Sequence, residues 1–161
     1  MVDSPVVARI WDYGWLSRDE LQLAPAPSAP ALIASYVASP QFGTSFLPSD
    51  KDESSIHGPF VRSRISSDDF VLFEEAALQP YLDQFFLWPE WNKPATPDQC
   101  SAVGAALRAA FERSAICYRL RFDETSSSLH HEWGFVFTVF RELLFLQPES
   151  GHVTRFVIGY D

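Results

Sequence analysis

The chain has 161 residues, of which 47% are hydrophobic, 15% aromatic and 20% charged. This composition excludes a disordered tail or a fibrous repeat and predicts one domain that buries roughly two-thirds of its unfolded surface. The net charge of −9 argues against direct contact with a nucleic-acid backbone. No stretch approaches the ~18 apolar residues of a membrane helix, and the N-terminus lacks a signal peptide's basic start and apolar core. We therefore expect a soluble, cytoplasmic protein.

The single domain, residues 1–161, divides into two parts of different composition. Eleven of the twelve prolines precede residue 98, and residues 1–99 carry a net charge of −8 against −1 for residues 100–161. We expect an irregular, Pro-rich, acidic part over residues 1–96 and a regular part of helix and sheet over residues 97–161.

The first part contains short predicted elements separated by proline and polar loops. Ser17 and Glu20 match the two ends of a capping box, which indicates a helix start. Pro80 interrupts an otherwise helical pattern near the end of this part. In chain order we expect a helix over residues 17–23, an extended connector over 24–30, a helix over 31–38, a strand over 60–65, an apolar run over 70–73 and a helix over 74–86.

The second part has clearer signals. Thr96, Pro97 and Gln99 form a complete helix start, and apolar residues follow at spacings of 3, 4 and 4. The pattern predicts, in order, a helix over residues 97–113, a strand over 116–122, a segment over 131–142 that fits both strand and helix, and a hairpin of residues 143–146 and 153–158. The fold class is therefore α+β, an antiparallel sheet flanked by helices with a C-terminal β-hairpin.

No nucleophile elbow, phosphate loop or dinucleotide motif occurs, so we expect no catalytic residue and no cofactor. His130, His131 and Glu132 form the strongest candidate cluster for metal or catalytic chemistry. Adjacent strand residues point to opposite faces, so we expect no metal ligand set there. The cluster nevertheless supports an alternative in which a small enzyme or ligand-binding domain assembles its site around these three residues.

Acidic and aromatic residues interleave in the first part of the chain. Aromatic anchors surrounded by acids are typical of a protein interface directed at a basic partner. The predicted partner-binding residues are Asp68, Asp69, Glu74, Glu75, Trp88, Glu90 and Trp91.

Short segments near the C-terminus resemble the last portion of uncharacterised small bacterial proteins: Trp133-Gly134-Phe135-Val136, Phe140-Arg141-Glu142, Gly151-His152-Val153 and Asp161. This resemblance covers residues 133–161 and implies no activity. In size, charge and absence of catalytic motifs, the chain also resembles immunity proteins of bacterial toxin systems. That likeness implies an inhibitor that occludes a basic, nuclease-like toxin. The protein is expected to be a monomer or a homodimer, the homodimer being suggested by the hydrophobic C-terminal hairpin.

Overall fold

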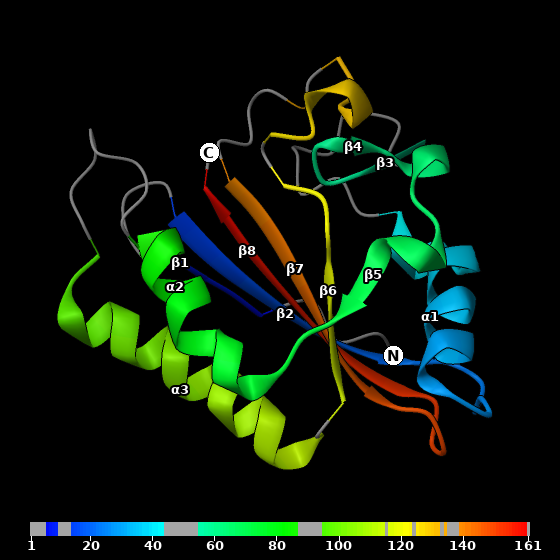
Figure 1. Ribbon diagram of the computed structural model, residues 1–161, viewed down its shortest axis with the longest axis horizontal. Coiled ribbons are helices and arrows are strands. Elements are labelled where there is room, and N and C mark those ends of the chain that lie inside the picture. The colour runs from blue at the N-terminus through cyan, green and yellow to red at the C-terminus, as the bar shows by residue number, and fades with distance from the viewer. Residues whose placement is uncertain are drawn as a thin grey trace.

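The computed structural model describes residues 6–9, 14–43, 55–86, 95–114, 116–123, 125–132, 134 and 139–160. Its centre is a six-stranded antiparallel sheet in the order β1-β2-β8-β7-β6-β5 (Figure 1). The sheet strands are β1 (Val6–Arg9), β2 (Gly14–Gln22), β5 (Phe70–Leu72), β6 (Cys117–Leu120), β7 (Val139–Gln147) and β8 (His152–Tyr160). The remaining elements are helices α1 (Ala29–Ala38), α2 (Leu78–Phe86) and α3 (Pro97–Arg113) and the separate pair β3 (Ile56–His57) and β4 (Phe60–Val61). The α+β class in one domain is confirmed.

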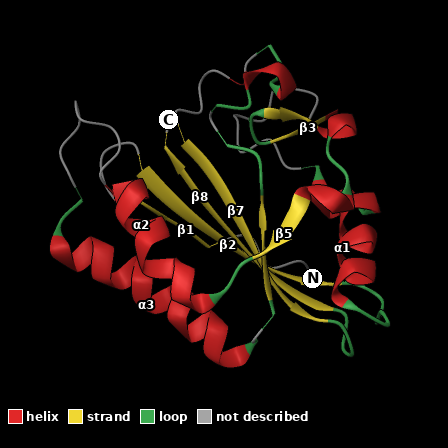
Figure 2. Cartoon of the chain, viewed as in Figure 1, coloured by secondary structure: helices red, strands yellow, loops and turns green. Residues whose placement is uncertain are grey.

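Helices lie on both faces of the sheet (Figure 2). Successive side chains of β7 alternate between the two sides, as strand geometry requires. Leu143 and Phe145 join the buried residues of α2 and α3, whereas Leu144 and Leu146 join those of α1. The molecule is therefore three layers deep, with one core on each side of the sheet.

The C-terminal hairpin is confirmed and is longer than the pattern predicted. The strands β7 and β8 pair over nine residues each, from Val139 opposite Tyr160 to Gln147 opposite His152. Gly151 closes the turn with φ +72°, and a Cβ atom there would lie 2.3 Å from the carbonyl oxygen of Leu23. Of the ambiguous segment, residues 139–142 are strand, while 133 and 135–138 lie outside the described residues.

The long helix is also confirmed. Gln99 donates its backbone N–H to the Thr96 hydroxyl at 3.3 Å, and the Gln99 side chain accepts the Thr96 N–H at 2.8 Å. The predicted capping box therefore forms with both of its hydrogen bonds, and α3 begins at Pro97.

The predicted helix over residues 17–23 is wrong, because residues 17–22 belong to strand β2, which pairs with both β1 and β8. Ser17, Asp19 and Leu21 all point inward and are buried. Because two of these three inward residues are polar, the sequence does not show the alternation of apolar and polar residues that predicts a strand. The buried Asp19 is tolerated because Arg155 lies directly opposite on β8.

Two other elements of the first part are shorter than predicted. In the segment 60–65, only Phe60 and Val61 are strand, and a 3-10 turn follows at Arg62–Arg64. The segment 74–86 starts with a 3-10 turn and becomes the α-helix α2 at Leu78. Pro80 fits there because it lies in the first turn, where no intrahelical N–H bond is required.

Candidate functional site

Three of the predicted partner-binding acids lie beside β5, a strand at one edge of the sheet. Asp68 belongs to the turn before β5, and Glu74 and Glu75 follow it. All three side chains are exposed. The other predicted residues of that part, Trp88, Glu90 and Trp91, lie outside the described residues.

Asp69 differs from its neighbours because its carboxylate is used inside the protein. It is only 5% exposed, and its Oδ2 accepts the Ser66 backbone N–H at 2.8 Å and the Ser66 hydroxyl at 2.9 Å. Its Oδ1 lies 2.6 Å from Arg121 Nη2. Asp69 therefore stabilises the turn before β5, and we correct its prediction as a residue that faces a partner.

The edge strand itself presents an apolar residue that the sequence did not single out. Leu72 is 61% exposed, the largest exposure among the described large hydrophobic residues. Among the described residues β5 pairs with β6 alone. Arg121 donates its N–H to Asp69 and Phe73 donates its own to Cys117, so the backbone groups of Leu72 point away from β6. We call Asp68, Leu72, Glu74 and Glu75 the β5 edge surface.

A depression of about 560 Å³ adjoins this surface on the α2 side. The residues that line it include Leu72, Glu74, Tyr81, Arg119 and Arg141. It therefore offers charges of both signs next to the exposed Leu72.

The histidine cluster does not form a convergent site. His131 places its Nε2 3.0 Å from the Gly58 carbonyl oxygen, and His130 forms an isolated bridge with Phe60. Partial burial, with the neighbouring His131, lowers the pKa of His130. Glu132 is exposed. Within the described part of the chain, no three His, Cys, Asp or Glu side chains converge in a way that would hold a metal ion.

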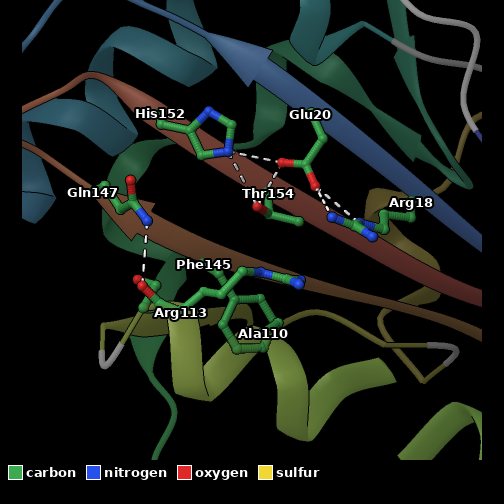
Figure 3. A pocket seen from close by; sticks show the side chains of 9 residues that line it. Arg18, Glu20, Ala110, Arg113, Phe145, Gln147, His152 and Thr154 are labelled. Atoms are coloured by element: carbon green, nitrogen blue, oxygen red, sulfur yellow. Dashed lines mark hydrogen bonds and ion pairs between the residues drawn. The ribbon is translucent and has the colours of Figure 1, made fainter. Parts of the chain in front are cut away.

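A polar pocket that sequence reasoning missed lies between α3 and the strands β2, β7 and β8 (Figure 3). Glu20 is the acceptor for several of its polar side chains: the Glu20 Oε2 accepts the Thr154 hydroxyl at 2.7 Å and lies 2.8 Å from His152 Nε2. Arg18 donates to the other oxygen, Oε1, at 2.8 Å from its Nε. Burial alone would raise the pKa of Glu20, but these hydrogen bonds and the Arg18 charge lower it, so the group is ionised.

A second polar cluster is fully buried on the α1 face. Tyr36 of α1 donates to Glu142 Oε1 at 2.7 Å, and His57 Nε2 lies 2.6 Å from Glu142 Oε2. Arg155 donates to Asp19 Oδ2 at 2.7 and 2.9 Å and to the Tyr36 hydroxyl at 3.2 Å. We call these five residues the buried network.

Burial alone would raise the pKa of Glu142, but His57, Arg155 and Tyr36 together outweigh it and hold the pKa below its ordinary value of 4.5. Burial raises the pKa of Tyr36 well above its ordinary range. All five residues are buried, each at most 7% exposed, so no ligand reaches them from solvent. Their chemistry is therefore structural: they join α1, β3 and three strands of the sheet.

Searches of protein-family models, of curated proteins and of solved structures find no match to this chain. No helix in the described ranges is long and apolar enough to cross a membrane. The functional argument therefore depends on the surfaces and pockets themselves.

Proposed function

We propose that the protein is an acidic binding module that occludes a basic protein partner, as an immunity-type inhibitor does with a nuclease-like toxin. The β5 edge surface is the proposed contact site. The observation that carries the proposal is the exposed Leu72 on a sheet edge, flanked by three exposed acids.

The charge of this surface supports a basic partner. Asp68, Glu74 and Glu75 add to an overall net charge of −9, which attracts and steers a cationic protein during encounter. Leu72 supplies the apolar contact that slows dissociation once the partners have docked. The outward backbone groups of Leu72 also suit the addition of an extended segment of the partner to the sheet edge.

The test is a binding measurement against the proteins encoded by the neighbouring genes, with a charge-matched control. In one variant Asp68, Glu74 and Glu75 become Lys. In the control variant three exposed acids on α2 and α3 become Lys instead, namely Asp83, Asp98 and Glu112. In each variant three changes of +2 take the net charge from −9 to −3.

We expect the edge variant to lower the association rate by about tenfold or more at low salt, and the control to lower it far less. Leu72→Ser should mainly raise the dissociation rate. Stopped-flow fluorescence at two salt concentrations measures both rates. Equal effects of the two triple variants would reduce the role of the acids to net charge alone and contradict a localised site, as would the absence of any neighbouring gene product that binds.

A further inference from the structure

The polar pocket of Figure 3 concentrates positive charge in an otherwise acidic protein. The basic residues that line it are Arg18, Arg113 and His152, and the acidic one is Glu20. Because one carboxylate faces two guanidinium groups, the pocket carries a surplus of positive charge, even with neutral His152.

The single carboxylate is already saturated with donors. Arg18 donates to one oxygen of Glu20, with both its Nε and one Nη atom in contact. The other oxygen meets the Thr154 hydroxyl and His152 Nε2. Glu20 therefore holds these side chains in place and leaves no strong acceptor for a further cation.

The polar groups of the pocket that remain available to a ligand are hydrogen-bond donors. Within the described residues, the Arg113 guanidinium makes no ion pair with a carboxylate, and Arg18 uses only two of its three nitrogens on Glu20. In Figure 3 the Arg113 side chain extends across the pocket from the end of α3, and Arg18 lies on the far side. The pocket measures about 310 Å³, which is room for one oxyanion with several waters.

From this surplus of donors and positive charge we infer that the pocket binds an oxyanion, a phosphate or carboxylate group, between Arg18 and Arg113. Guanidinium groups match the planar and tetrahedral oxygens of such groups through paired hydrogen bonds. His152 and Thr154 keep the Glu20 carboxylate in position. This inference is independent of the proposed protein partner, because none of the residues that line the pocket belongs to the β5 edge surface.

The experiment titrates isotope-labelled protein with inorganic phosphate and, separately, with acetate, at constant ionic strength. The readout is the nuclear magnetic resonance shift of the His152 and Thr154 amides and of the arginine side chains. We expect saturable shifts confined to the pocket for at least one anion. Saturation with phosphate, with acetate or with both identifies the preferred oxyanion.

Arg113→Gln provides the decisive variant and Arg108→Gln its control. Both arginines are exposed on α3 and both changes remove one positive charge, but Arg108 does not line this pocket. Arg113→Gln should weaken binding about tenfold or more, the loss of a charge-assisted contact, while Arg108→Gln stays within about twofold of the original. Shifts that never saturate for either anion, or equal weakening in the two variants, would overturn the inference. Thermal unfolding of each variant verifies that the fold is kept.

Discussion

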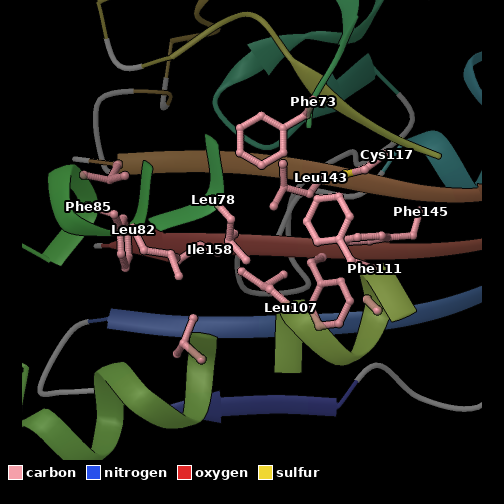
Figure 4. Packing of buried hydrophobic residues seen from close by; sticks show 14 of the residues in the cluster. Phe73, Leu78, Leu82, Phe85, Leu107, Phe111, Cys117, Leu143, Phe145 and Ile158 are labelled. Atoms are coloured by element: carbon pink, nitrogen blue, oxygen red, sulfur yellow. The ribbon is translucent and has the colours of Figure 1, made fainter. Parts of the chain in front are cut away.

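The two faces of the sheet are covered by helices through different kinds of contact. The face under α2 and α3 is closed by aromatic and aliphatic side chains, among them Leu107, Phe111, Leu143 and Phe145 (Figure 4). The face under α1 also buries apolar residues, but the buried network runs through its centre. Apolar contacts are non-directional, whereas every buried polar group requires a particular partner.

This difference determines how each helix layer is positioned. On the α2 and α3 side, many similar contacts hold the helices, and the edge-to-face pair of Phe111 and Phe145, with ring centroids 4.9 Å apart, is one of them. On the α1 side, Tyr36 bonds to both Glu142 and Arg155, so α1 has one satisfactory position. We therefore expect the α1 face to be the less tolerant of substitution.

The largest effect should come from Glu142→Ala. The change leaves the Tyr36 hydroxyl and His57 without their acceptor in a site that is closed to water. Removing one member of a buried charged pair typically costs about 3–5 kcal/mol. Urea unfolding monitored by fluorescence measures this loss. Glu112→Ala, an exposed acid on α3, is the control and should stay within about 0.5 kcal/mol of the original protein.

A smaller loss is expected from the adjacent residue on the other face. Leu143→Ala removes a completely buried side chain from the same cluster as Phe145 and leaves a cavity among apolar neighbours. Such changes cost about 2–5 kcal/mol, toward the lower end where neighbours relax into the space. The same unfolding measurement compares Leu143→Ala with Glu142→Ala. A larger loss for the leucine would refute the claim that the polar face is the less tolerant one.

The smallest expected effect is a difference in how the free energy of unfolding depends on pH for changes on the two faces. Because the pKa of Glu142 lies below 4.5 in the folded protein, its ionised form contributes stability above that pH, and the contribution is lost as the pH falls through the folded value. The free energy of unfolding should therefore decrease more steeply in acid for the original protein than for Glu142→Gln. Leu143→Ala should run parallel to the original protein at every pH, since it removes no titrating group. Parallel curves for all three proteins would show that Glu142 does not contribute through its charge.

The candidate site was predictable in part. The exposed acids Asp68, Glu74 and Glu75 follow from the rule that unpaired carboxylates stay in water. Asp69 is the same residue type as Asp68 and follows it directly in the sequence. Its carboxylate is nevertheless buried, where it contacts Arg121 and Ser66. The sequence predicts Leu72 only as part of an apolar run. Its exposure follows from the position of β5 at the edge of the sheet, which the order of the strands decides.

Where local chemistry is enough, the sequence by itself determined the structure. The helix from Pro97 to Arg113 begins with a capping box that closes within four residues, and the hairpin of β7 and β8 turns at a glycine that can adopt a positive φ. These features depend on residues close together in the sequence and on no distant partner, so the sequence alone predicts them.

Only the tertiary structure decided the place of the inward polar residues. Asp19 and Arg155 are 136 positions apart, and neither charge can be buried without the other. The capping pattern at Ser17 to Glu20 is satisfied by a helix in isolation, but the sheet gains two strand pairings and an internal ion pair instead. A local signal of about 1 kcal/mol is outweighed when the alternative satisfies a buried charge and completes the centre of a sheet.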